Sequence, residues 1–167
     1  ALLRPKRIGT VTLNSSDPYD PPKIDPAFFS HPEDMDVMIK GWKKQYQMLE
    51  SSAFDDIRGN AFYPVDANDD KAIEQDIRNR ADTQYHPVGT CKMGTDDDSL
   101  AVVDNNLKVY GLDNLRVIDA SGMPTLVGAN TNAPTIMIAE KVADQIKEQY
   151  GFSKQQANEQ AEDEMVV

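Results

Sequence analysis

Residues 115–124 read LRVIDASGMP, and this stretch gives the clearest indication of the fold. Residues 115–120 form a nearly continuous apolar and β-branched run, which is typical of a strand buried on both faces of a parallel sheet. The run Ser121-Gly122-Met123-Pro124 then predicts a loop, because glycine and proline interrupt regular structure. We therefore expect a buried strand that ends in a loop at Ser121.

A helix is expected to follow this loop, from about Ala133 to Tyr150. Its apolar residues recur at four-residue spacing and so share one face of a helix: Ile138, Val142 and Ile146. Asn132 can cap the amino end, Pro134 is tolerated in the first turn, and Gly151 is a suitable stop.

The first part of the chain predicts two short extended segments. Residues 8–13, with the sequence IGTVTL, are rich in β-branched residues and stop at a turn-forming run. Lys23-Ile24-Asp25 lies between prolines, which lack the N–H group that a central strand needs, so it predicts an edge strand or a loop. We expect the segment around Val11 to form an antiparallel sheet with a helix packed on it.

Two amphipathic helices are predicted next. Ser30 and Glu33 have the spacing of a capping box, so the first helix should begin there and run to about Glu50. Large side chains at steps of three and four should place one stripe of this helix against a core: Met35, Met38, Ile39, Trp42, Tyr46 and Leu49. The second helix should run from Asp69 to Arg80, with residue 68 or 69 as its cap.

The composition excludes several classes of function. The chain has 17 lysine and arginine residues against 28 aspartate and glutamate residues, and the resulting net charge of −11 repels phosphate backbones. Nucleic acid is therefore not an expected partner. No apolar run is long enough to cross a bilayer. The single cysteine, Cys91, cannot close an intramolecular disulfide, and with two histidines it forms no zinc ligand set, so no metal site is expected.

The two histidines are the side chains that could act as acid or base near neutral pH. His31 lies at the predicted helix start, which favours a structural role. His86 begins the run HPVGTCKMG, in which a proline fixes the backbone and two glycines permit close approach of a flat partner. Taken by itself, such a histidine is more often structural than catalytic. Cys91, in the same run, is expected to be a packed, inert thiol.

A second polar cluster, GANTNAP at residues 128–134, precedes the last helix, where main-chain N–H groups and the helix dipole favour negative charge. By itself this cluster fits a capped loop better than a ligand site. The chain has no glycine-rich dinucleotide fingerprint, Walker loop or nucleophile elbow, so it cannot carry a complete nucleotide site.

Considered together, these motifs strongly resemble the C-terminal part of the glucose-methanol-choline (GMC) oxidoreductases. The resemblance rests on residues 86–94 (HPVGTCKMG), 115–124 and 128–141 (GANTNAPTIMIAEK), in this order and spacing. Residues 4–13 look like the start of the same region, so the resemblance extends from about residue 2 to residue 149. Within the family, the chain looks nearest to bacterial choline dehydrogenases and their medium-chain alcohol dehydrogenase relatives.

The resemblance implies an α+β fold, with the antiparallel sheet and packed helices of the GMC substrate domain plus the last strand and helix of a Rossmann-like FAD-binding domain. Residues 1–85 would belong to the substrate-binding domain, and residues 86–150 would carry the active-site strand and return to the FAD-binding domain. Residues 151–167 predict an acidic, disordered tail. The chain lacks the family's glycine-rich FAD motif and an initiator methionine, so we expect a C-terminal fragment against which the rest of a parent chain packs.

The same resemblance implies roles for individual residues. His86 matches the family's active-site base, and an imidazole with an ordinary pKa of about 6.5 suits removal of an alcohol proton while hydride passes to FAD. Asn130 matches the position of a second histidine or asparagine, and its amide can donate to the developing alkoxide. Four further residues match positions beside the flavin: Asp119, Ala120, Thr131 and Asn132.

The implied reaction is the oxidation of choline to betaine aldehyde, with FAD as cofactor and a respiratory electron acceptor. A medium-chain aliphatic alcohol is the alternative substrate. From the residues alone, an acidic, non-catalytic interaction domain stays open as a different class of function. We expect the isolated chain to be inactive, and the parent protein to be cytoplasmic or associated with a membrane.

Overall fold

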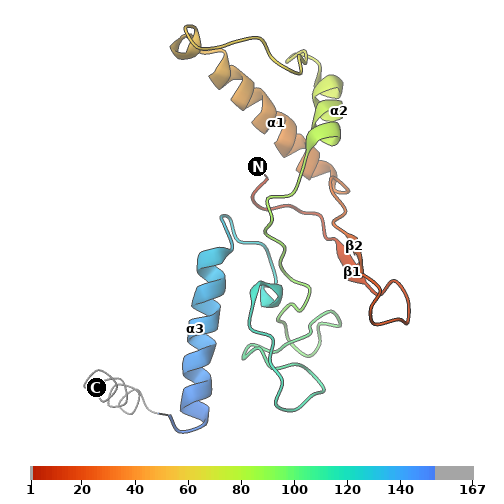
Figure 1. Ribbon diagram of the computed structural model, residues 1–167, viewed down its shortest axis with the longest axis vertical. Helices are drawn as coiled ribbons and strands as arrows, with labels where there is room; N and C mark the ends of the chain where they lie inside the picture. Colours follow the sequence, from red (N-terminus) through yellow and green to blue (C-terminus); the bar gives the residue numbers. More distant parts are fainter. Residues whose placement is uncertain (1, 153–167) are drawn as a thin grey trace, which may run out of the picture. The chain divides into compact units, whose positions relative to one another are not determined.

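The computed structural model describes residues 2–152, which divide into two compact units. The first unit runs to His86 and the second begins at Pro87 (Figure 1). Each unit has its own apolar core. The predicted assignment of residues 1–85 and 86–150 to domains of the GMC family stays a prediction. Apart from its first two residues, the predicted tail at 151–167 lies outside the described residues.

The first unit contains a two-stranded antiparallel sheet of β1 (Thr10–Thr12) and β2 (Lys23–Asp25), with Val11 opposite Ile24. The antiparallel pairing predicted around Val11 is confirmed. The prediction that a helix packs on this sheet is wrong, because the residues of both strands are exposed and α1 (Pro32–Leu49) packs against α2 (Asp70–Arg80) instead (Figure 1). Each three-residue strand carries one apolar side chain, which is too little apolar surface to bury a helix.

The two helices of the first unit, which flank the short helical turn η1 (Ser52–Phe54), begin in different ways. At α2 the predicted cap is confirmed, because the Asp69 carboxylate accepts the N–H groups of Lys71 and Ala72 at 2.9 and 3.2 Å. The capping box predicted for α1 is wrong. His31 occupies the N-cap position and no side chain caps this helix, since Ser30 lies one residue too early.

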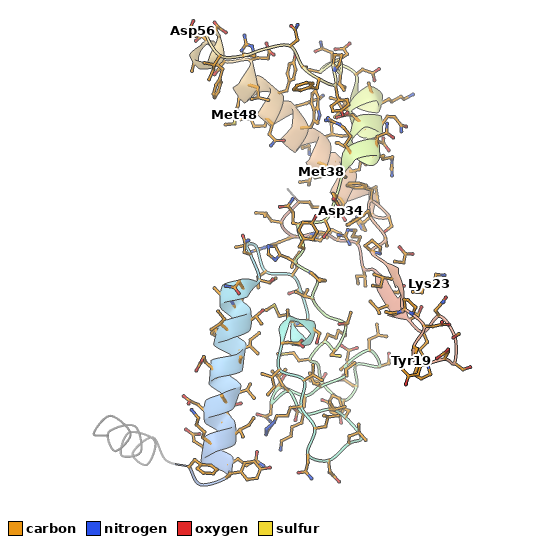
Figure 2. All side chains as sticks on the ribbon, in the orientation of Figure 1. Tyr19, Lys23, Asp34, Met38, Met48 and Asp56 are labelled. Carbon is orange, nitrogen blue, oxygen red and sulfur yellow. The ribbon has the colours of Figure 1, made fainter. Side chains whose placement is uncertain are left out.

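The core of the first unit lies where α1 and α2 meet. It consists of three buried residues with partly buried neighbours packed around them: Met35, Ile73 and Ile77, with Phe29, Met38, Ile39, Trp42 and Val65. The predicted apolar stripe of α1 is buried only along its first half, and Tyr46 and Leu49 are 38% and 57% exposed. Because α2 has 11 residues and α1 has 18, the last turns of α1, including Met48, extend past their partner helix (Figure 2).

A buried carboxylate holds the first residues of the chain against α1. Asp34, in the first turn of α1, is 2% exposed. Its two oxygens accept the main-chain N–H groups of Lys6 and Arg7 at 2.8 and 3.1 Å. A desolvated carboxylate requires such donors, so these two bonds account for its burial.

The second unit has isolated β-bridges in place of strands within its described residues: Met93 with Val103, Val103 with Val109, and Lys108 with Arg116. The prediction of a doubly buried parallel strand at residues 115–120 is therefore wrong, and Leu115 is 46% exposed. Such a strand needs packed elements that cover both faces of its sheet. In the described chain, residues 115–117 pair along one edge with residues 107–109, and this pairing is antiparallel.

The helical part of the second unit consists of the single turn η2 (Ala120–Gly122) and the long helix α3 (Asn132–Gln149). Thr131, and not the predicted Asn132, is the N-cap residue of α3. Gly151 ends the helix as predicted, with a φ of +78°. There the N–H groups of Gly151 and Phe152 donate to Glu148 and Lys147 at 3.2 and 2.8 Å, which is a Schellman motif.

One face of α3 covers the core of the second unit, which is formed by three buried residues and their partly buried neighbours: Val103, Leu107 and Val142, with Met93, Val102, Val109, Val117, Ile118, Ile138 and Ile146. The fold is thus α+β, with a small antiparallel sheet and three α-helices among residues 2–152. None of the helices in this described range combines the length and apolar character needed to cross a membrane.

Candidate functional site

His86 is the last residue of the first unit and lies in an irregular segment that follows α2. Its side chain is half-buried. Tyr85, directly before it, has a φ of +61°, a left-handed conformation that residues with a side chain seldom adopt. The surrounding structure must impose this conformation, as it does at four other residues of the described chain: Ala27, Phe29, Leu107 and Asn114.

Residues 89–94, which we call the strap, lie along the turn η2. The N–H of Cys91 donates to the carbonyl oxygen of Ser121 at 3.0 Å, and the N–H of Met93 donates to that of Gly122 at 2.9 Å. The strap comes from the motif that begins at His86, and η2 comes from the motif at residues 115–124. The structure therefore brings these two motifs into contact through main-chain hydrogen bonds.

The two glycines of the strap are required by the packing of the chain itself. Gly89 has a φ of +84°, and a Cβ added there would lie 3.3 Å from the carbonyl oxygen of Met123. A Cβ added at Gly94 would lie 2.9 Å from the Cβ of Ala101. The protein's own atoms therefore lie where a side chain would be at each glycine, and the close approach of a flat partner to these glycines stays a prediction.

Two of the residues predicted to contact FAD lie at the start of η2. One carboxylate oxygen of Asp119 accepts the N–H and the hydroxyl of Ser121 at 2.7 and 2.5 Å, which shapes this turn. Asp119 is exposed and Ala120 is half-buried. This local role of Asp119 was not predicted. An aspartate two residues before a serine is the sequence signal that could have indicated it.

The other predicted residues lie at the amino end of α3. Thr131 is 8% exposed, whereas Asn130 and Asn132 are exposed. No side chain caps this helix and its first turn contains no acidic residue. Since the first N–H groups of a helix have no partner within it, those of Asn132 and Ala133 point outwards from a positive helix end. This end can therefore hold an electron-rich group.

The neighbouring Lys92 is paired with an acidic side chain. Its ammonium lies 2.6 Å from the carboxylate of Asp98, and this hydrogen bond lowers the pKa of Asp98, with a further contribution from the N–H of Leu100. Cys91 beside it is a half-buried free thiol. Its predicted inertness stays a prediction.

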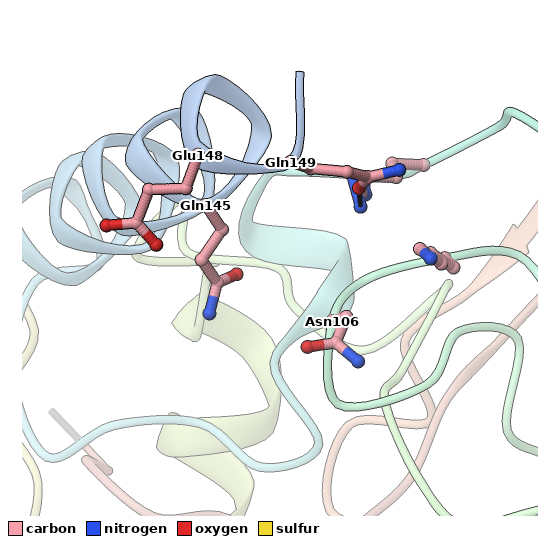
Figure 3. A pocket seen from close by; sticks show the side chains of 6 residues that line it. Asn106, Gln145, Glu148 and Gln149 are labelled. Atoms are coloured by element: carbon pink, nitrogen blue, oxygen red, sulfur yellow. Dashed lines mark hydrogen bonds between the residues drawn. The ribbon is translucent and has the colours of Figure 1, made fainter. Parts of the chain in front are cut away.

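The second unit also has a cavity of about 350 Å³ along the last turns of α3 (Figure 3). Six polar side chains line it: Asn106, Lys108, Arg116, Gln145, Glu148 and Gln149. The rise of a helix places Gln145 about 20 Å from the amino end of α3. The cavity includes none of the predicted site residues. The Glu148 carboxylate lines it together with the two cations and opposes their charge, so the cavity is not the candidate site.

Residues 5–139 match the family described as GMC oxidoreductase. This chain is a member of the GMC oxidoreductase family. The match includes the strap, η2 and the start of α3. His86 belongs to the first unit and Asn130 to the second, so their pairing around one substrate stays a prediction.

Related GMC proteins match most of this chain. The alcohol dehydrogenase (acceptor) of Pseudomonas putida is 49% identical over 143 residues, which are 85% of this chain and 26% of that protein. The oxygen-dependent choline dehydrogenase of Cronobacter sakazakii is 42% identical over 140 residues, 83% of this chain and 25% of that protein. The mitochondrial choline dehydrogenase of Mus musculus is 42% identical over 146 residues, 87% of this chain and 24% of that protein. The chain thus spans about a quarter of the length of these relatives.

Solved GMC structures share the fold. Pyridoxine 4-oxidase from Mesorbium loti matches with a TM-score of 0.79 and 31% identity, over 86% of this chain and 28% of that chain. An FAD-dependent oxidoreductase from Chaetomium thermophilum matches with a TM-score of 0.81 and 27% identity, over 90% of this chain and 26% of that chain.

Proposed function

We propose that this chain forms the catalytic, C-terminal part of an FAD-dependent alcohol dehydrogenase of the GMC family. The observation that carries this proposal is the pair of hydrogen bonds between the strap and η2, at 3.0 and 2.9 Å. They link the segment that follows His86 to the segment that holds Asp119 and Ala120, within the region that matches the family. Relatives named alcohol dehydrogenase and choline dehydrogenase support the same activity.

The residues present fit a flavin. The amino end of α3 has outward N–H groups at Asn132 and Ala133, no capping side chain and no acid in its first turn. Such an end favours an electron-rich edge, as it favours an anion. Thr131 and Asn132 would hold that edge, and Asp119 and Ala120 would lie beside it. FAD, when bound, supplies the acceptor of the hydride that leaves the alcohol carbon.

We assign removal of the alcohol proton to His86 and stabilisation of the alcohol oxygen to Asn130. An imidazole nitrogen of His86 accepts the hydroxyl proton, so negative charge develops on the alcohol oxygen as the C–H bond breaks. One positioned base of this kind contributes about 10²- to 10⁴-fold in rate. The side-chain amide of Asn130 cannot act as a base, and it donates a hydrogen bond to the same oxygen. Loss of such a donor costs on the order of 3 kcal/mol in transition-state stabilisation. The product is the aldehyde.

Choline is the first substrate candidate, since relatives at 42% identity are choline dehydrogenases. A medium-chain aliphatic alcohol is the second, and the 49% identity to an alcohol dehydrogenase favours it. That relative's name refers to an acceptor without specifying it, whereas the choline dehydrogenase of Cronobacter sakazakii is named oxygen-dependent, so a respiratory acceptor and dioxygen are the two alternatives. Comparing kcat/KM for choline and for octanol, with dioxygen and with a quinone analogue as acceptor, distinguishes these alternatives.

The test of the proposal uses the full-length protein that carries this chain. Its coding region upstream of Ala1 should encode a glycine-rich dinucleotide motif, and the purified protein should show flavin absorbance. His86→Ala should lower kcat by about 10²- to 10⁴-fold while FAD stays bound. His31→Asn is the matched control, because it removes the other histidine and leaves a good N-cap residue on α1. A His86→Ala protein with near-normal kcat at saturating alcohol would show that another group is the base.

A further inference from the structure

The polar cavity along the last turns of α3 carries opposite charges on its two walls. One wall, formed by residues 106–116, holds Lys108 and Arg116, and the α3 wall holds Glu148 (Figure 3). We propose that this cavity binds a small zwitterion, a molecule of the amino acid class that has a carboxylate and an ammonium group. The cavity lies wholly within the second unit, and the inference does not rest on the proposed function.

Two cations lie side by side on the first wall. Lys108 and Arg116 face each other across an antiparallel bridge. The main-chain hydrogen bonds on either side of this pair, at 3.0 and 3.1 Å, join the neighbouring residues and not the two residues themselves. Lys108 and Arg116 are therefore a non-hydrogen-bonded pair, in which the side chains share one face and lie closest together. Like charges in such a pair repel each other, so a bound anion would stabilise this wall.

These two cations have no anionic partner in the part of the chain that the structure describes, because neither forms an ion pair there. The Nη2 of Arg116 donates to the Gln149 side chain at 2.8 Å, but its buried Nε–H has no acceptor among the described residues. Buried N–H groups are nearly always paired, so an acceptor is missing here. A carboxylate supplies acceptor oxygens in the geometry that suits a guanidinium. This wall therefore favours the carboxylate of a ligand.

The α3 wall favours the opposite charge. Gln145, Glu148 and Gln149 are three and four residues apart and line the cavity from one side of the helix. The Glu148 carboxylate forms no ion pair within residues 2–152. It also lies in the last turn of α3, where the helix dipole attracts cations. An ammonium group fits this wall, whereas the same carboxylate repels a purely anionic ligand such as phosphate.

The experiment titrates the full-length protein, by isothermal titration calorimetry, with three ligands of similar size. γ-Aminobutyrate carries both charges, butyrate carries the carboxylate alone, and butylammonium carries the ammonium group alone. γ-Aminobutyrate should bind with a Kd about 10-fold lower than that of either other ligand, because each missing charge removes a charge-assisted hydrogen bond at a partly exposed site. The cavity volume of about 350 Å³ is sufficient for molecules of this size.

Three variants locate the site. Lys108→Gln and Glu148→Gln should each raise the Kd of γ-aminobutyrate about 10-fold, and Glu148→Gln should also remove the preference over butyrate. Lys147→Gln is the matched control, because it removes a cation from the same turn of α3 that pairs with Asp144 and does not line the cavity. Its Kd should stay unchanged. Without ligand, Lys108→Gln should keep or raise Tm, since it ends the repulsion with Arg116.

Equal Kd values for γ-aminobutyrate and butyrate in the wild type would overturn the inference. Binding that Lys108→Gln leaves unchanged, or no binding at all, would do the same. A lower Tm of unliganded Lys108→Gln would also overturn it, because that result would show that an acidic side chain of the full-length protein already pairs with Lys108. Flavin absorbance and alcohol oxidation are measured separately, so their absence would overturn the proposed function and leave this inference standing.

Discussion

Replacing Asp34 by alanine is expected to release the first residues of the chain from α1. The Asp34 side chain is 2% exposed and accepts the N–H groups of Lys6 and Arg7 at 2.8 and 3.1 Å. These are the hydrogen bonds that join residues 2–7 to α1 in the described chain. The substitution removes both acceptors at once, so both N–H groups must find water.

The size of the effect follows from the two bonds. A hydrogen bond to a charged group contributes about 1.5 to 3 kcal/mol. The bond at 2.8 Å should lie nearer the upper value and the bond at 3.1 Å nearer the lower one. Lys6 is exposed, so water reaches its released N–H readily, and this reduces the loss. We expect Asp34→Ala to lower the free energy of unfolding of the first unit by about 3 kcal/mol.

Urea denaturation of the 167-residue chain measures this loss, followed by the fluorescence of Trp42, the single tryptophan. Hydrogen exchange at the Lys6 and Arg7 amides should also become faster. Asp36→Ala is the control, because it removes the same charge two residues later from an exposed position, and its effect should stay within about 0.5 kcal/mol. Equal losses in the two variants would show that the buried carboxylate does not hold the amino-terminal segment.

Two further predictions concern pH and the cofactor. The hydrogen bond from Arg80, and secondarily that from Trp42, lowers the pKa of Asp76. A carboxyl with a lowered folded pKa stabilises the fold above its unfolded value of about 3.9, and this stability is lost as pH falls through the folded pKa. Tm measured from about pH 6 to pH 3 should therefore fall at the acidic end, and less so in Asp76→Asn. The isolated 167-residue chain should stay colourless and inactive after incubation with FAD, and a stoichiometric yellow complex after gel filtration would contradict this.

Local sequence signals predicted the elements whose stabilising contacts lie within the element itself. The Asp69 carboxylate reaches N–H groups two and three residues away, and the Gly151 turn closes onto the last carbonyls of α3. These bonds form between near neighbours in the chain, so residue type and spacing are enough to predict them. The capping box predicted at Ser30 is wrong by one position, because residue spacing does not locate the first residue of a helix to within one residue.

Elements that need a distant partner were predicted less well. The apolar run at residues 115–120 has strand composition, yet its pairing in the described chain is a single bridge of Arg116 with Lys108. The stripe on α1 was assigned to a core along its whole length, although the shorter α2 covers only part of it. Residue composition indicates the tendency of a segment to be buried, whereas its actual burial depends on which other elements pack against it.

For the candidate site, the sequence by itself determined the chemistry that is available: one histidine at the start of the run HPVGTCKMG, an asparagine-rich cluster before a helix, and the order in which they occur. The tertiary structure alone decided that the strap lies along η2 and that Gly89 faces the Met123 carbonyl. Residues 89 and 123 are too far apart along the chain for any local pattern to indicate their contact. That contact forms only when the chain folds back on itself, because it depends on distance in space and not on spacing in sequence.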